Sequence, residues 1–249
     1  MRSRRTSSIA IKGLLLALLS LCLFAGHALA GRAVGTVTHL SGPLLVKKLD
    51  GTTRVLTRNS TVEEGDTLIT EKRTYARIRF IDSSDVTLRP GTLFKVERFA
   101  YDEKAPKGDS AVMSLVKGGL RSVTGKIGKR GNQDAYEMKT PSATIGVRGT
   151  AYGATFCQGG ECGKLPAGLY VDVAEGKIVV TNKGGAQLFT AGQFGFVPSL
   201  HAPPVILPKN PGASFTPPPA MTTGPASTGP QKGGQPASPA PKPVDCEVR

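Results

Sequence analysis

Tryptophan is absent from this chain of 249 residues, and only 6% of the residues are aromatic. Stacking surfaces for sugars or single-stranded nucleic acid are built from such rings, so the composition argues against nucleic acid as a partner. Beyond residue 30 the remaining histidines are His39 and His201, which cannot form a closely spaced metal-binding pair. The H-E-x-x-H, G-x-S-x-G and Walker sequences are also missing. We therefore expect no enzyme, no bound metal and no cofactor.

Long apolar runs are missing too, apart from a short one near the start. Residues 14–24, LLLALLSLCLF, follow four basic residues and precede the small-x-small sequence of residues 28–30. This order predicts a secretory signal peptide cleaved between Ala30 and Gly31. The run is too short for a bilayer, which needs about 17–25 residues, and no later segment is apolar enough to span one. Alternatives are an uncleaved anchor or lipid attachment at Cys22.

The charge that remains after cleavage is strongly positive. Removal of residues 1–30 takes away four of the 32 basic residues and none of the 18 acidic ones, which leaves a net charge of +10. Such a chain, exported to the periplasm or beyond it, favours an anionic envelope polymer such as peptidoglycan or lipopolysaccharide, or an envelope protein. A solvated basic surface is the alternative. The glycine-rich stretch 125–131 lacks the G-K-[ST] ending of a phosphate loop, so we interpret it as a basic, solvated loop.

Cysteine is scarce, with three residues left beyond the predicted signal peptide. Cys157 and Cys162 flank the turn-like tetrapeptide 158–161, which predicts a short disulfide in an oxidising compartment. Two zinc ligands are the alternative, although no second Cys/His pair lies nearby. Cys246 is then odd and is either free or linked to another chain.

Proline is concentrated near the end of the chain. Thirteen of the 19 prolines lie in residues 203–243, among Gly, Ser, Thr and Ala. This composition predicts a disordered or polyproline-like tail over residues 201–249. The tail could be a tether, an extended recognition strand or a solvated segment without a specific role.

Residues 31–200 have the pattern of one β-rich domain. Apolar and polar residues alternate in stretches such as 76–81 and 170–173, which is typical of half-buried strands. Residues that favour turns interrupt the pattern every eight to twelve residues or so, at about the spacing of short strands. No amphipathic helix longer than two turns follows the predicted signal peptide.

A weak repeat, apolar-x-x-Gly-x-apolar, suggests how the strands are connected. Each copy predicts a strand, a tight turn whose glycine takes a positive φ, and a second strand. Stacked units of this kind would form a β-solenoid, and hairpins of a β-sandwich would give the same local pattern. The copies centre on Gly91, Gly118, Gly176 and Gly192, with a looser copy at Gly65.

Four segments resemble, in the same order, the FecR domain of bacterial envelope proteins. Residues 64–70 resemble its G-D-x-I-x-T step, and residues 76–90 resemble its a-x-l-x-f-x-D-G-S-x-v-x-l-x-P segment, with Ser83 in place of the usual Gly. Residues 116–121 fit the strand before the closing signature. The signature itself, T-P-x-A-x-x-G-V-R-G-T, is matched by residues 140–150.

The resemblance, over roughly residues 35–156, implies an all-β, solenoid-like domain that binds or senses a partner. The best-known members are inner-membrane regulators with a cytoplasmic sigma-factor-binding segment. Only about a dozen residues precede the apolar run here, so we expect an exported, free-standing member without that segment. The leading hypothesis is a module that binds or senses a partner protein or an anionic envelope polymer. Alternatives are an accessory of cell-surface signalling, coupled to an outer-membrane receptor or regulator, and a polysaccharide-binding or carbohydrate-active protein.

The signature residues have structural and binding interpretations. Pro141 holds the residue before it in an extended conformation. Gly146 and Gly149 permit a bulge or the close approach of another backbone. Arg148 could bind a carboxylate or phosphate, or could lock neighbouring strands through their carbonyls, and we favour the second. The signature positions considered are Thr140, Pro141, Gly146, Val147, Arg148, Gly149 and Thr150.

Overall fold

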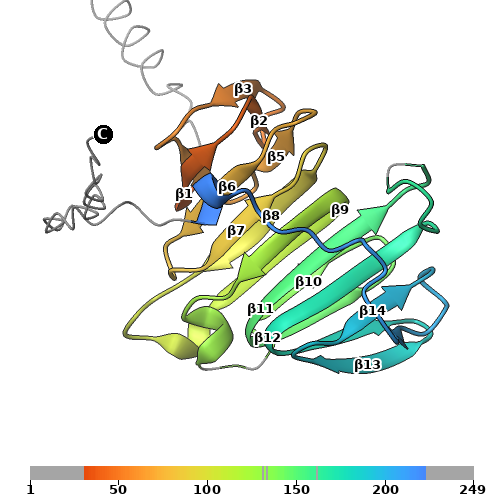
Figure 1. Ribbon diagram of the computed structural model, residues 1–249. Coiled ribbons are helices and arrows are strands. Elements are labelled where there is room, and N and C mark those ends of the chain that lie inside the picture. Colours follow the sequence, from red (N-terminus) through yellow and green to blue (C-terminus); the bar gives the residue numbers. More distant parts are fainter. Residues whose placement is uncertain (1–30, 131, 133, 161, 223–249) are drawn as a thin grey trace, which may run out of the picture.

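The computed structural model describes residues 31–222 except 131, 133 and 161 (Figure 1). The predicted all-β fold is confirmed. Short helices in this part of the chain are η1 (Pro106–Gly108), η2 (Ile127–Lys129) and α2 (Pro219–Thr222). The strands are β1 (Ala33–Leu40), β2 (Leu44–Lys47), β3 (Thr53–Leu56), β4 (Thr61–Glu63), β5 (Thr67–Thr70), β6 (Ala76–Phe80), β7 (Asp85–Leu88), β8 (Leu93–Ala100), β9 (Ser110–Val123), β10 (Tyr136–Lys139), β11 (Thr144–Cys157), β12 (Gly168–Asn182), β13 (Gly185–Thr190), β14 (Phe194–Val197) and β15 (Val205–Leu207).

These strands form one large mixed sheet that does not close on itself. The longest path through it runs β15-β14-β12-β11-β10-β9-β7-β6-β1-β4. β13 pairs with β12, and a branch of β3, β2, β5 and β8 joins the path at β9. β9 and β10 are parallel, whereas the other described pairs are antiparallel.

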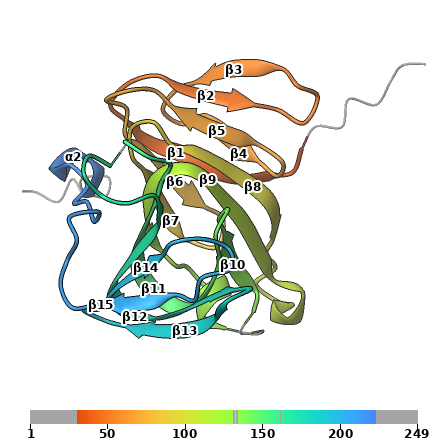
Figure 2. The same ribbon diagram turned by 90° about the vertical axis from the view of Figure 1, so that its right-hand side faces the viewer.

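Each of the three long strands belongs to two layers of this sheet (Figures 1 and 2). In β9, residues 110–117 pair with β8 and residues 120–123 pair with β7. In β11, residues 144–146 pair with β10 and residues 151–156 pair with β9. β12 divides likewise between β13 and β14. We call the half that contains β8, β10 and β13 layer A, and the half that contains β6, β7 and β14 layer B. The chain winds between the two layers, as the solenoid-like prediction expects.

Glycines stand where the chain passes from one layer to the other. Gly118 in β9 has a φ of 81° and Gly176 in β12 has a φ of 76°. A Cβ atom at Gly118 would lie 2.6 Å from Cα of Thr92, and one at Gly176 would lie 2.5 Å from the carbonyl oxygen of Gly149. We call these changes of layer corners, and at Gly118 and Gly176 the neighbouring corner leaves no room for a side chain. The predicted turn geometry is confirmed, because positive φ is found at Gly65, Gly91, Gly118, Gly176 and Gly192.

The hydrophobic core lies between the layers. The rings of Phe80 in β6 and Phe99 in β8 stack with their centroids 5.0 Å apart. The hydroxyls of Ser122 in β9 and Tyr136 in β10 lie 3.1 Å apart, and both side chains are fully buried. Burial raises the pKa of Tyr136, so its hydroxyl stays neutral in the core.

The first part of the predicted tail, residues 201–222, lies on the sheet instead of projecting away from it. β15 pairs with β14 through the contacts of Val205 with Phe196 and of Leu207 with Phe194. After β15 the chain crosses the outer face of layer B and ends its described course at α2, near β6 (Figure 1). We call residues 208–222 of this segment the strap.

Two arginines hold the strap by its backbone. Arg77 donates a hydrogen bond to the carbonyl of Met221, and Arg89 donates one to the carbonyl of Ala213, each at 3.1 Å. Proline-rich composition predicted disorder because the segment has few apolar side chains to bury. Its backbone carbonyls find donors on layer B all the same, and composition does not reveal such contacts. The remainder of the predicted tail lies outside the described residues.

Candidate functional site

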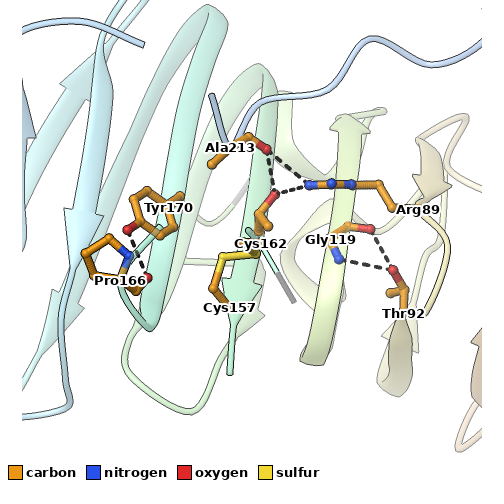
Figure 3. The surroundings of a disulfide bond; sticks show 9 residues. Arg89, Thr92, Gly119, Cys157, Cys162, Pro166, Tyr170 and Ala213 are labelled. Atoms are coloured by element: carbon orange, nitrogen blue, oxygen red, sulfur yellow. Dashed lines mark hydrogen bonds between the residues drawn. A yellow bond between two sulfur atoms is a disulfide. The ribbon is translucent and has the colours of Figure 1, made fainter. Parts of the chain in front are cut away.

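Three turns at one edge of the fold are joined by buried threonine hydroxyls. Thr92 donates its backbone N–H to Oγ1 of Thr70 at 2.9 Å. The hydroxyl of Thr92 donates to the carbonyl of Gly119 at 2.9 Å and accepts the N–H of Gly119 at 3.0 Å (Figure 3). Both threonines are almost completely buried. The β5–β6 turn, the β7–β8 turn and the bend in β9 are thus fixed relative to one another.

These turns form a basic pocket of about 350 Å³. Lys72 and Arg73 come from the first turn, Arg89 from the second and Lys117 from the bend in β9. The opposite wall is provided by β11 and by the loop that follows it. No carboxylate lines the pocket among the described residues. Four cations around one hollow create a local positive potential that attracts anions.

Arg89 is the most constrained cation of this pocket. Its Nη1 donates hydrogen bonds to Oγ1 of Thr155 and to the carbonyl of Ala213, both at 3.1 Å. Its guanidinium carbon lies 5.2 Å from the centre of the Phe215 ring. Burial lowers the pKa of Arg89, but a guanidinium remains charged at neutral pH. In the part of the chain that the structure describes, no carboxylate neutralises it.

The predicted disulfide is confirmed and lies beside this pocket (Figure 3). Cys157 ends β11, and its Cα lies 5.8 Å from that of Cys162, which lines the pocket. The bridge packs with Tyr170, whose hydroxyl donates to the carbonyl of Pro166 at 2.9 Å. Because both thiols are used in the bond, the zinc alternative does not apply. The disulfide fixes the loop that forms one wall of the pocket.

The pocket cations belong to no motif noted in the sequence, although a signal was present. Arg89 stands two residues before Gly91, and Lys117 stands immediately before Gly118. Both glycines belong to the repeat, so each basic residue lies just before a turn of the repeat. Whether these basic residues meet in one pocket depends on which turns lie side by side, and strand pairing determines that.

Most of the family signature supports the fold. The hydroxyl of Thr140 donates to the carbonyl of Ala143 at 2.8 Å and accepts its N–H at 3.0 Å, which closes the turn before β11. Val147 is buried in the core, and Gly149 has the positive φ of a corner residue. Thr150 donates its hydroxyl to the carbonyl of Lys177 at 2.7 Å, so it joins β11 to β12.

Other signature residues face solvent. Pro141 and Arg148 are exposed, and Gly146 lies on the outer face of layer A. The prediction that Arg148 locks neighbouring strands through their carbonyls finds no such hydrogen bond among the described residues. Gly146 and Arg148 instead line a second, smaller hollow.

The glycine-rich stretch 125–131 is held by carboxylates from elsewhere in the fold. Ile127 donates its N–H to Oδ2 of Asp82 at 3.3 Å, and Lys126 pairs with Glu103. These partners occupy two of the groups that a phosphate would need. The stretch was predicted to be a basic, solvated loop, but Gly125 and Ile127 are buried, so it is only partly solvated. Gly131 itself lies outside the described residues.

Some predicted features cannot be located in the structure. The predicted signal peptide and Cys246 lie outside the described residues, and Gly31 is the first residue described. Within the described ranges, no helix has the length and apolar character needed to cross a bilayer. The same ranges contain no cluster of three or more His, Cys, Asp or Glu side chains that could hold a metal ion.

Comparison with protein families finds a match to part of the chain. Residues 66–179 match the family model described as FecR protein, which confirms the resemblance found in the sequence. The matched segment includes the three joined turns, the signature and much of β12. A comparison with curated proteins finds no match.

Solved structures offer partial likenesses. Two crystal structures of candidate anti-sigma factors from Parabacteroides distasonis ATCC 8503 are 14% and 13% identical, with TM-scores of 0.45 and 0.44. Each alignment covers 58% of this chain and 60% of the other chain. A cell surface anchoring domain is 30% identical over 25% of this chain and 83% of its own length, with a TM-score of 0.25.

Proposed function

Because residues 66–179 match the FecR family model, we propose that this chain is an exported, non-enzymatic binding module of the bacterial envelope. Its basic pocket would hold an anionic envelope polymer that carries phosphate groups, as lipopolysaccharide does. The observation that carries the proposal is Arg89, a half-buried cation without a carboxylate partner among the described residues.

A cation in this position favours an anionic ligand for energetic reasons. Burial removes part of the hydration of the Arg89 guanidinium, and buried charges in proteins are normally paired. Two acceptors, Thr155 and Ala213, use only part of the five N–H donors of that group. A phosphate can take the remaining donors in a planar, bidentate arrangement.

The other pocket cations would add attraction at longer range. Lys72 and Arg73 are exposed at the rim of the pocket. Exposed ion pairs contribute only about 0.2–1 kcal/mol each, so they would increase the association rate more than the affinity. The net positive charge of the chain beyond residue 30 acts in the same direction.

Export is supported by two separate features. Residues 1–30 have the order of a cleavable signal peptide, and the bond between Cys157 and Cys162 is of the kind that persists in oxidising compartments. We therefore propose that the protein works in the periplasm or outside the cell. Mass spectrometry of the protein purified from cell envelopes would test this placement, since a mature N-terminus at Gly31 is the expected result.

A binding experiment tests the pocket. Purified protein would be titrated with lipopolysaccharide at low and at physiological salt, and compared with the double variant Lys72→Gln/Arg73→Gln. We expect that variant to bind about 3- to 10-fold more weakly, because it loses two exposed ion pairs. The matched control is Lys104→Gln/Lys107→Gln, which removes the same charge from two exposed positions that do not line the pocket. Equal weakening in both double variants would show a general charge effect and would refute the pocket as the site.

The FecR match also favours a second role, as an accessory of cell-surface signalling that contacts an outer-membrane receptor or regulator. A photo-crosslinking residue at position 72, at the rim of the pocket, would distinguish the two in cells. A crosslink to an envelope receptor supports signalling. A crosslink to lipopolysaccharide alone supports the polymer-binding role.

A further inference from the structure

Gly146 lacks a structural reason to be glycine. It lies in an extended part of β11, outside the positive φ region that the corner glycines occupy. A Cβ atom there would meet only the carbonyl oxygen of Val179, at an ordinary distance of 3.8 Å. Gly149, three residues later, has a φ of 61° and stands at a corner. A strand glycine without such a constraint is typical of a place where another molecule approaches the backbone closely.

The missing side chain contributes to a hollow of about 200 Å³ on layer A. Ile145 and Val147 are buried, so the residues that alternate with them in β11, among them Gly146 and Arg148, face outward. Gly146 is flanked by Glu137 on β10 and by Val179 on β12. The hollow therefore lies over Gly146, between Thr144 and Arg148 along β11, and is bordered by β10 on one side and β12 on the other.

Charges of both signs line this hollow. Arg148 provides the cation, and Asp134 and Glu137 provide carboxylates. Among the described residues, these three side chains have no ion-pair or hydrogen-bond partner, whether with one another or with other groups. By contrast, Lys139 on the same strand as Glu137 pairs with Glu97 at 3.3 Å. Asp134 and Arg148 are exposed to solvent, so the charges around the hollow are hydrated but have no protein partner within the described fold.

We propose that this hollow binds the zwitterionic amino-acid group of a ligand, a carboxylate and an ammonium carried on one carbon atom. Arg148 would hold the carboxylate through its planar fork of donors. Glu137 and Asp134 would accept hydrogen bonds from the ammonium. Thr144 and Thr181 line the hollow with neutral hydroxyls that can serve either group.

Simple ions fit this arrangement less well. An anion would meet the two carboxylates, and a cation would meet the guanidinium of Arg148. A zwitterion satisfies all three charges at once, and a volume of about 200 Å³ has room for a group of that size. Free amino acids carry this group, and so do cell-wall peptides with an uncrosslinked diamino acid.

The experiment is a titration of the isotope-labelled full protein, followed by amide chemical shifts. The probes are diaminopimelate, a muropeptide that contains it, and N-acetylated diaminopimelate in which both amines are blocked. We expect shifts centred on Glu137, Gly146 and Arg148 with the first two probes and none with the blocked one. A response to the muropeptide alone would assign the cell wall as the source, whereas a response to both would show that the amino-acid group suffices.

Two variants test the geometry. Gly146→Val places a side chain in the hollow and suits an extended strand, so the fold should be at least as stable while the shifts disappear. Arg148→Gln, at an exposed position, should weaken binding at least about tenfold and leave the fold intact. The proposal is wrong if no unblocked probe shifts these amides at millimolar concentration. It is also wrong if Arg148→Gln binds as well as the natural protein.

Discussion

Replacement of Gly118 by alanine tests whether close contact between stacked corners holds the two layers together. Gly118 lies at the bend of β9 with a φ of 81°, next to the β7–β8 turn. A Cβ atom there would lie 2.6 Å from both Cα and Oγ1 of Thr92 and 2.9 Å from the carbonyl oxygen of Gly91. Two of these three neighbours are backbone atoms, so they cannot move aside by a change of rotamer.

The expected loss of stability has two parts. Alanine in the left-handed region costs about 1–2 kcal/mol relative to a right-handed conformation. Forcing an extra carbon into a packed contact costs about 1–3 kcal/mol more. We therefore expect Gly118→Ala to lower the free energy of unfolding by about 3 kcal/mol, or the Tm by roughly 6–12 °C for a domain of this size.

Gly91→Ala is the matched control. Gly91 has a φ of 69°, but a Cβ atom at this position would meet nothing within 4 Å. It should lose only the conformational part, about 1 kcal/mol. Urea unfolding of both variants, followed by circular dichroism, gives the two values under the same conditions.

Gly176 provides an independent test of the same effect. Gly176→Ala would bring a Cβ atom to 2.5 Å from the carbonyl oxygen of Gly149, whereas Gly192→Ala at a similar φ would meet nothing within 4 Å. The larger loss should again fall on the crowded member of the pair. If each crowded variant loses no more than its open control, the corners are not held by backbone contact and the reasoning fails.

Three further predictions concern other links in the fold. Replacing Cys157 and Cys162 by serine should lower the free energy of unfolding by about 2 kcal/mol, the value for a short closed loop, and thermal unfolding with and without a reductant checks this. Thr150→Val should cost about 1–2 kcal/mol in urea unfolding, because the hydrogen bond to the carbonyl of Lys177 is lost in a buried position, and an unchanged midpoint would contradict the role assigned to that hydroxyl. Burial, together with nearby arginines, lowers the pKa of His39 below 6.5, so the unfolded chain takes up a proton first as the pH falls through that value. Stability should therefore decrease from pH 7.5 to pH 5.5 or so, and His39→Gln should reduce that decrease.

The fold class could be predicted from the chain because its main determinants are local. Period-two alternation predicts strands, and the repeat glycines mark the turns at which φ becomes positive. The disulfide was predictable for the same reason, since Cys157 and Cys162 are separated by one short turn. The order of strands in the sheet could not be predicted in this way, because it depends on contacts between residues far apart in the sequence. Register and pairing bring together residues such as Thr70, Thr92 and Gly119 that share no pattern in the sequence.

The candidate sites also depend partly on local sequence and partly on long-range strand pairing. The signature pointed to Gly146 and Arg148, but their place beside Glu137 around one hollow follows from the pairing of β10 with β11. Arg89 belongs to no motif or cluster in the sequence, and its lack of a carboxylate partner among the described residues is visible only when the pocket is assembled. The strap was missed because proline-rich composition does not reveal that Arg77 and Arg89 bind its carbonyls, or that the few apolar side chains it has, such as Ala213 and Met221, are buried.

The strap has a mechanical consequence. A pull on the chain from beyond residue 222 would act first on the hydrogen bond between Arg77 and Met221 and next on the contacts of Arg89 with Phe215 and Ala213. Met221, Phe215 and Ala213 follow one another toward β15 along the chain, so tension would break these contacts one at a time and leave the strand ladders unloaded until β15 was reached. The C-terminal segment would therefore yield at low force and lengthen before the sheet itself bore any load.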